Sequence, residues 1–191
     1  IPGFQQLAII SKIPASYICS KNWSTFGAID PPRGFASAII QHEGNNILLC
    51  NVHLKSNLVF GGNHERGIQI NILKRELAIQ QLVRFISHDS EIVAGNVSSV
   101  IVAGDFNSNT DNPLFVSERT FSLLDSCGFK SCFNGISAEN RITMPAKDAY
   151  PAATFDFLFI KGMRYSEKPA ILKNSVSDHY AVVCFFGKNR E

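Results

Sequence analysis

The chain of 191 residues lacks several features that would assign its class directly. It has no apolar run approaching the roughly 18 residues that a membrane-spanning helix needs. Its formal net charge is only +2, whereas domains that bind nucleic acid through their overall field are usually far more basic. The charge therefore says little about the partner, and a local basic groove stays open. No internal repeat or low-complexity tract is present.

Paired cysteines and a targeting segment are also missing. The five cysteines form no C-x-x-C pair, which disfavours a zinc ribbon or a thioredoxin-type site. Cys127 and Cys132 could pair, but the sequence does not decide this. The chain begins at Ile1-Pro2 without a basic segment followed by an apolar one, so no signal peptide is visible. We expect a soluble protein and leave its localisation unassigned.

What the sequence does contain indicates one globular domain over residues 1–191. Hydrophobic residues make up 45% of it, enough for a substantial core. A helical apolar pattern predicts a helix over Asn71–His88, and a shorter helix is expected over Ser117–Ser126, ended by Gly128. His42 to Asn46 has the composition of a hairpin turn. Strands dominate and helices separate some of them, which predicts an α/β or α+β class. The expected strands are Leu7–Ser11, Ala36–Gln41, Ile47–Leu54, Val100–Ala103, Phe155–Ile160 and Tyr180–Phe186.

Four motifs share one design, in which an apolar strand carries acidic, amide or imidazole groups near one end. A strand buried in a sheet delivers its last residues to the sheet edge, where polar groups from several strands can converge. We therefore predict that these groups meet in one cleft. The motifs are Asn51–Lys55, Val100–Ser108, Thr154–Ile160 and Ser177–Val183.

The first two motifs contribute His53, Asp105 and Asn107. His53 alternates with apolar neighbours, and taken alone it is more often a core-edge histidine than a functional one. Asp105 and Asn107 follow a buried strand two residues apart, so both can point to the same side. A carboxylate with a carboxamide suits a hard cation and a phosphate, although an Asx-rich turn is the structural alternative.

The last two motifs contribute Asp156, Asp178 and His179. Asp156 lies between phenylalanines, and a buried carboxylate is costly unless it is paired. His179 is a candidate general acid or base. Because Asp178 is adjacent to His179 in an extended strand, its side chain tends to point elsewhere. We therefore predict a hydrogen bond between Asp156 and His179, and leave Asp178 for metal or solvent.

The ordered set N-x-H-L, G-D-F-N, x-D-F-L-F and S-D-H-Y resembles the signature of the endonuclease/exonuclease/phosphatase (DNase I-like) superfamily. The segment Leu7–Lys12 resembles a strand of that family. Arg33-Gly34 before a strand and the helix with its early Arg75 fit it too. For Arg75 we favour contact with backbone carbonyls over contact with substrate. The resemblance implies a sandwich of two mixed β-sheets flanked by helices.

The resemblance also implies roles for the motif residues and a divalent cation, Mg²⁺ or Mn²⁺. His53 would hold or protonate a phosphate oxygen. Asp105 would bind the metal or help to activate water, and Asn107 would position the phosphate or that water. Asp156 would orient His179, which would act as general base or stabilise the pentavalent oxyanion. Asp178 would lie near the metal.

Two family features have no counterpart in the chain. The family uses an Asn on its first strand and a metal-binding Glu on its second, both upstream of the region where this chain starts. Asp30 and Glu43 are the only acidic residues before His53, and neither ends a buried strand. We therefore expect an N-terminally incomplete domain whose metal site is weakened.

The most favoured function is metal-dependent hydrolysis of phosphodiesters, with nucleic acid as the first substrate and a monomeric state when complete. Lys55 would add a cation on the side of His53. The segments Ser56–Gly67 and Thr143–Thr154 would frame the groove, where Tyr150 could stack on a base, although a loop tyrosine packed on its own domain is commoner. The alternatives are a phosphatase or lipid phosphodiesterase on the same fold, or an impaired fragment that acts only in binding.

Overall fold

The computed structural model describes residues 7–24, 29–148, 150–173 and 176–187; position 149 of the predicted groove segment lies outside them. The helices are α1 (His64–His88), α2 (Ser90–Ala94) and α3 (Thr120–Ser126), with 3₁₀ turns at η1 (Pro113–Phe115) and η2 (Ala138–Asn140). The strands are β1 (Ala15–Lys21), β2 (Phe35–His42), β3 (Asn45–His53), β4 (Val97–Asp105), β5 (Lys130–Ser131), β6 (Asp156–Lys161), β7 (Arg164–Tyr165), β8 (Ala170–Leu172), β9 (Ala181–Val183) and β10 (Phe186–Gly187).

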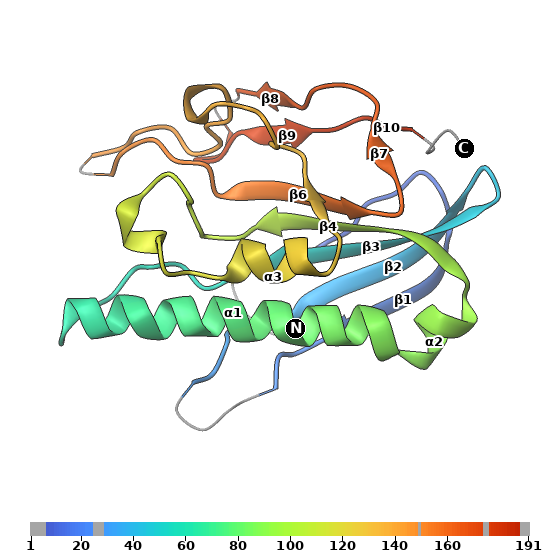
Figure 1. Cartoon of the computed structure of the whole chain (residues 1–191), viewed down its shortest axis with the longest axis horizontal. Helices are drawn as coiled ribbons and strands as arrows, with labels where there is room; N and C mark the ends of the chain where they lie inside the picture. Colours follow the sequence, from blue (N-terminus) through green and yellow to red (C-terminus); the bar gives the residue numbers. More distant parts are fainter. Residues whose placement is uncertain (1–6, 25–28, 149, 174–175, 188–191) are drawn as a thin grey trace.

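A mixed six-stranded sheet organises the fold, in the order β1-β2-β3-β4-β6-β5 (Figure 1). β3 and β4 run parallel, and a parallel pair needs a long crossover, which α1 and α2 provide. β6 returns antiparallel to β4. The carboxyl ends of β3 and β4 and the amino end of β6 therefore share one edge of the sheet.

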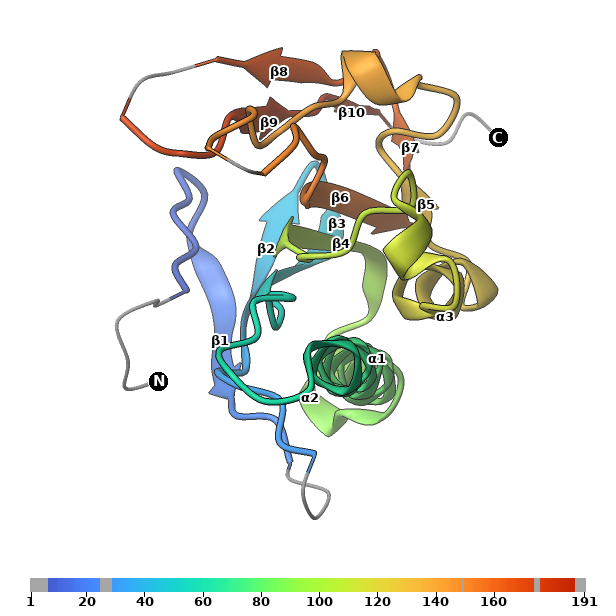
Figure 2. The same cartoon turned by 90° about the vertical axis from the view of Figure 1, so that its left-hand side faces the viewer.

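The helices and the remaining strands lie on opposite sides of this sheet (Figures 1 and 2). Among the described residues the second layer consists of two short ladders, β8 with β9 and β10 with β7. The predicted strand Tyr180–Phe186 is thus divided between β9 and β10, because the chain leaves the ladder after Val183. The mixed α/β architecture confirms the predicted class.

Local signals explain most element boundaries. The hairpin between β2 and β3 turns on Glu43 and Gly44, which both have positive φ (48° and 77°), as the tight primed turns of hairpins require. α1 begins seven residues earlier than its apolar pattern indicates, at His64 rather than Asn71. The first turns are polar, and the Asn63 side chain caps them by accepting the Arg66 N–H at 2.9 Å.

The predicted strand Leu7–Ser11 is wrong. Those residues form no strand, and Ile10 is 97% exposed. The edge of β2 pairs instead with Ala15–Lys21, which places Tyr17 and Cys19 against the core. An apolar run becomes a strand only where a partner edge is free, and here Ala15–Lys21 occupies that edge.

The core beneath the site is aromatic and tightly packed. Phe106 is fully buried and lies 5.1 Å from Phe159 and 5.7 Å from Phe121, ring centre to ring centre. At Gly104 (φ 141°) an added Cβ would stand 1.9 Å from the Val52 carbonyl oxygen, so only glycine lets β3 and β4 approach this closely before Asp105. No helix within the described residues is long and apolar enough to cross a bilayer.

Candidate active site

Strand topology brings the first three site residues together. His53 ends β3, Asp105 ends β4, and Asp156 begins β6. The pairing register places His53 opposite Asp105 and Asp105 opposite Asp156. Figure 2 views the molecule from this end of the sheet. The predicted convergence at strand ends therefore follows from one parallel and one antiparallel pairing.

His179 completes the group and forms the predicted hydrogen bond. Its Nδ1–H donates to Oδ2 of Asp156 at 2.7 Å, and its ring stacks on Phe155 with centroids 6.5 Å apart. This hydrogen bond, opposed by burial and reinforced by the charge of Asp156, raises the pKa of His179 to about 9. The imidazole is therefore held in its charged form at neutral pH.

Asp105 and His53 form a second pair, in which the histidine pKa is lowered instead of raised. Nε2 of His53 lies 3.4 Å from Oδ2 of Asp105. Burial, and the charge of Asp156 opposite it, raise the pKa of Asp105 to about 6. Burial, and the nearby Arg33, lower the pKa of His53 to about 4, so this imidazole is neutral at pH 7.

Asn107 is fixed by the turn that follows β4. Its backbone N–H donates to Oδ1 of Asp105 at 2.8 Å, and its side-chain Nδ2 donates to the Leu54 carbonyl at 3.1 Å. The residue has φ 51°, a left-handed conformation that asparagine tolerates better than most side chains. The Asx turn, which was the structural alternative for this motif, is therefore part of the site. The turn places the Asn107 carboxamide at the edge of the sheet.

Arg33 was not among the predicted site residues, although Arg33-Gly34 had been recognised as a family feature. Its Nη1 donates to the carbonyls of His53 and Leu54, at 2.9 and 3.0 Å. Burial lowers the pKa of its guanidinium, and the attraction of Asp105 opposes this. The arginine thus places a positive charge near His53 and Asp105.

Thr143 was also missed, and it holds the Asp156–His179 pair from behind. This fully buried residue accepts the backbone N–H groups of Phe155 and Asp156 on its hydroxyl oxygen, at 3.0 and 3.1 Å. Its carbonyl oxygen accepts the N–H of Tyr180, next to His179, at 2.6 Å. A lone threonine outside a motif gives no sequence signal for such a role.

A cavity of about 1390 Å³ is lined by Arg33, His53, Asp105, Asn107 and His179. Asp178 and Tyr150 line it too, and both are exposed, Tyr150 by 57%. Two predicted site residues, Asp156 and Lys55, do not border the cavity that the described residues form. β3 ends at His53, so the alternation that would have placed Lys55 beside it stops there.

Arg75 fixes one wall of the cavity instead of entering it. The fully buried guanidinium donates to the Lys55 carbonyl and to Asn57, both at 2.8 Å, and pairs with Glu118 at 2.6 Å. The expected contact with a backbone carbonyl is confirmed, and the ion pair with Glu118 is additional. α1 is thereby tied to the segment that follows His53.

The donor set fits a cation. Ligand atoms of Asp105, Asp156 and His179 lie within 4.8 Å of one another, and because a protonated His179 has no lone pair for a metal, the carboxylates would be the ligands. Two carboxylates that face each other in a largely buried position repel, which is the reason for part of the raised pKa of Asp105, and a cation between them would relieve this. Asp178 lines the same cavity and could supply a further oxygen.

Comparisons with known proteins place the fold. No protein-family model matches the sequence, and no curated protein matches it. An endonuclease/exonuclease/phosphatase family protein from Leptotrichia buccalis superposes with a TM-score of 0.60 at 15% identity, over 92% of this chain and 62% of its own. TDP2 from D. rerio, complexed with a single-strand DNA product, superposes with a TM-score of 0.61 at 15% identity, over 92% of this chain and 69% of its own. Sphingomyelinase C from Streptomyces griseocarneus superposes with a TM-score of 0.59 at 15% identity, over 94% of this chain and 66% of its own.

This chain spans 62% of the length of the Leptotrichia protein. At such low identity the likeness concerns the fold alone. The shared architecture is the DNase I-like fold, as the four motifs predicted.

Proposed function

We propose that this chain, which has the DNase I-like fold, hydrolyses phosphodiester bonds at the site formed by His53, Asp105, Asp156 and His179. The observation that carries the proposal is the pairing of the two carboxylates with the two histidines at one sheet edge. Buried acid–base pairs with displaced pKa values gather at catalytic sites more often than elsewhere.

The charge states suggest a division of labour. His179, protonated at neutral pH, would donate from Nε2 to a phosphate oxygen and stabilise the negative charge that builds up there. Asp156 would hold the ring in place and favour its charge. Asp105, ionised above about pH 6, would orient the attacking water and accept its proton. Of the two roles that the sequence left open for His179, the proposal takes oxyanion stabilisation, which the raised pKa supports.

Neutral His53 and charged Arg33 complete the phosphate-binding side. His53 would offer one ring nitrogen to a phosphate oxygen, and Arg33 would attract the anion from its position behind β3. The carboxamide of Asn107, anchored on Leu54, would orient the water or the phosphate. A divalent cation held by Asp105 and Asp178, Mg²⁺ or Mn²⁺, would neutralise phosphate charge.

Two substrate classes fit this chemistry. The sequence ranks nucleic acid first, and the D. rerio neighbour is complexed with a single-strand DNA product. A phospholipid is the second candidate, in line with the sphingomyelinase neighbour. The shared reaction is the proposal here, and endonuclease-like activity is the form of it that the motifs favour.

A soluble diester tests the reaction without a choice between these substrates. The release of 4-nitrophenolate from bis(4-nitrophenyl) phosphate is measured with Mg²⁺, with Mn²⁺ and with a chelator. We expect metal-dependent release that falls by about 10²-fold or more in His179→Gln. Equal release by the native chain and by this variant would refute the proposed site.

A further inference from the structure

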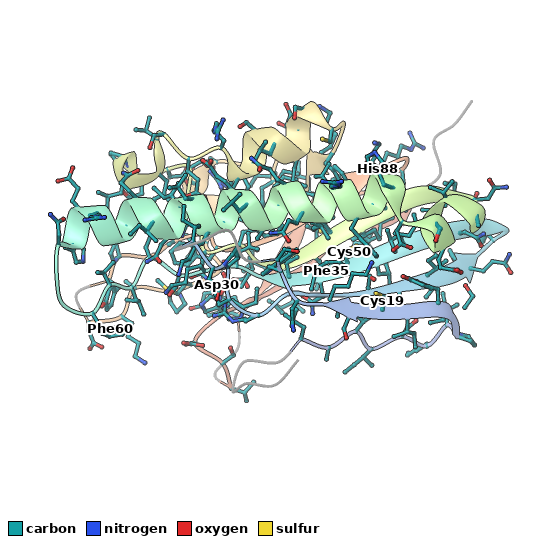
Figure 3. All side chains as sticks on the ribbon, turned by 90° about the horizontal axis from the view of Figure 1, so that it is seen from below. Cys19, Asp30, Phe35, Cys50, Phe60 and His88 are labelled. Atoms are coloured by element: carbon teal, nitrogen blue, oxygen red, sulfur yellow. The ribbon has the colours of Figure 1, made fainter. Side chains whose placement is uncertain are left out.

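The cavity opens through a rim of exposed apolar side chains, here called the apolar mouth: Leu58, Phe60, Leu114, Tyr150 and Val176. They come from four separate segments, and Phe60 and Val176 are 92% and 94% exposed. Figure 3 shows Phe60 at the end of the molecule where α1 begins. Thirteen large hydrophobic side chains are exposed among the described residues, and five of them lie at this one opening. The exposed apolar side chains are therefore clustered there and not scattered evenly over the surface.

The chemistry of the mouth disfavours a nucleic-acid strand. Such a strand needs a track of cations for its phosphates and flat aromatic faces for its bases. At neutral pH the charged groups that line the cavity are the cations Arg33, Lys147 and His179 and the carboxylates Asp105 and Asp178, a small positive excess that falls short of a track of cations. Apart from Phe60 and Tyr150 the mouth is aliphatic, and Val59, Met144 and Pro145 continue it inward.

A phospholipid surface matches the same features. Aliphatic side chains around a polar floor can enter the acyl boundary while the head-group phosphate reaches the residues below. With so small an excess of positive charge, the mouth does not require an anionic lipid. Tyr150 suits the boundary because its ring is apolar and its hydroxyl is polar.

We propose that the apolar mouth rests on a phospholipid surface and that the substrate is a phospholipid phosphodiester. This inference rests on the phosphodiesterase function proposed above. In the reaction the oxygen of water bonds to phosphorus and one ester P–O bond breaks. One proton of the water passes through Asp105 and ends on the released alcohol, which leaves a phosphomonoester.

Vesicle sedimentation tests the surface. The chain is mixed with phosphatidylcholine vesicles, and with vesicles that also contain phosphatidylserine. We expect binding to both, with little effect of salt. Phe60→Ser and Leu114→Ser each remove a large apolar group and should weaken binding by about tenfold.

Two matched controls lie outside the mouth. Ile18 on β1 and Val93 on α2 are 79% and 63% exposed, and neither lines the cavity. Ile18→Ser and Val93→Ser should leave vesicle binding unchanged. Equal losses in the mouth variants and the controls, or no binding by the native chain, would overturn the proposal. Single-stranded DNA that displaces the chain from vesicles would overturn it in favour of a nucleic-acid substrate.

Hydrolysis assays distinguish a failure of the lipid substrate from a failure of the phosphodiesterase function. We expect His179→Gln to keep vesicle affinity and to lose hydrolysis of both phosphatidylcholine and bis(4-nitrophenyl) phosphate. If the soluble diester is hydrolysed and phosphatidylcholine is not, the proposed function stands and the lipid substrate is refuted. If vesicles bind and neither diester is hydrolysed, the phosphodiesterase function fails, and the lipid substrate with it.

Discussion

At the scale of single residues, two histidines in one site carry opposite charge. His179 has its pKa raised to about 9 by the hydrogen bond that it donates to Asp156, whereas His53 has its pKa lowered to about 4 by burial and by Arg33. The neighbours, and not the residue type, decide which imidazole is charged at neutral pH. This difference underlies the proposed roles.

Replacing Asp156 by Asn should lower the pKa of His179 toward its ordinary value of 6.5, because the largest cause of its elevation is removed. The measurement is an NMR titration of the histidine ring protons in both proteins. His53→Gln is the control, since it leaves the Asp156 hydrogen bond in place. An unchanged His179 titration in Asp156→Asn would show that another group holds the charge.

The same substitution has a consequence for stability with a definite sign. A group whose pKa is higher in the folded state than in the unfolded state contributes to the unfolding free energy. That contribution is fully present below the unfolded-state pKa and is lost as the pH rises through the folded-state pKa. The native chain should therefore exceed Asp156→Asn in unfolding free energy most clearly below about pH 6.5, and the gap should narrow toward pH 9. Urea unfolding at several pH values gives the gap, and one that widens with pH would contradict the assignment.

Asp105→Asn should abolish most diester hydrolysis and weaken Mg²⁺ binding, since it removes a buried carboxylate from the cluster. In the native chain kcat/KM should rise as the pH passes through about 6, where this carboxyl loses its proton. Asp125→Asn, at a surface carboxylate with 69% of its side chain exposed, is the control. Calorimetry that gives equal Mg²⁺ affinity for all three proteins would exclude Asp105 as a ligand.

At the scale of elements, the segment before β6 positions two catalytic groups, one at the start of β6 and one just before β9. Thr143 accepts hydrogen bonds at the start of β6 and holds Tyr180 ahead of β9. Thr143→Val keeps the shape and loses the acceptor, so kcat should fall by about tenfold with KM little changed. The pKa of His179 should move as well, which a merely structural defect would not cause.

Thr143→Ser restores the hydroxyl and should recover most of the activity. Thr154→Val is a matched control, because that buried hydroxyl donates only to the Arg141 carbonyl, at 2.8 Å. If Thr154→Val loses as much activity as Thr143→Val, Thr143 has no positioning role beyond that of a buried core residue.

The tie between α1 and the segment after β3 rests on a buried ion pair. Glu118→Gln leaves Arg75 charged and uncompensated in the interior and should cost about 3–5 kcal/mol of unfolding free energy. Arg119→Gln disrupts the neighbouring pair with Glu76, where the arginine side chain is 64% exposed, and should cost much less. Similar losses in urea unfolding for the two variants would show that burial of the pair is not decisive.

At the scale of the whole molecule, the sequence predicts the site better than its surroundings. His53, Asp105, Asn107, Asp156 and His179 were predictable because each adjoins an apolar strand, and strand ends meet at sheet edges. Their roles remain predictions. Thr143 and the apolar mouth were not predictable, because they depend on tertiary contacts between segments without periodicity. The misplaced Leu7–Ser11 strand has the same origin, since only the free edge of β2 selects its partner.

The site joins residues that are far apart in sequence, so its members should act as a unit. The most direct test is a double-mutant cycle on kcat/KM for bis(4-nitrophenyl) phosphate, with the native chain, Asp156→Asn, His179→Gln and the double variant. If Asp156 acts through His179, the double variant should be no less active than His179→Gln alone. Losses that multiply, or an Asp156→Asn variant as active as the native chain, would contradict the account.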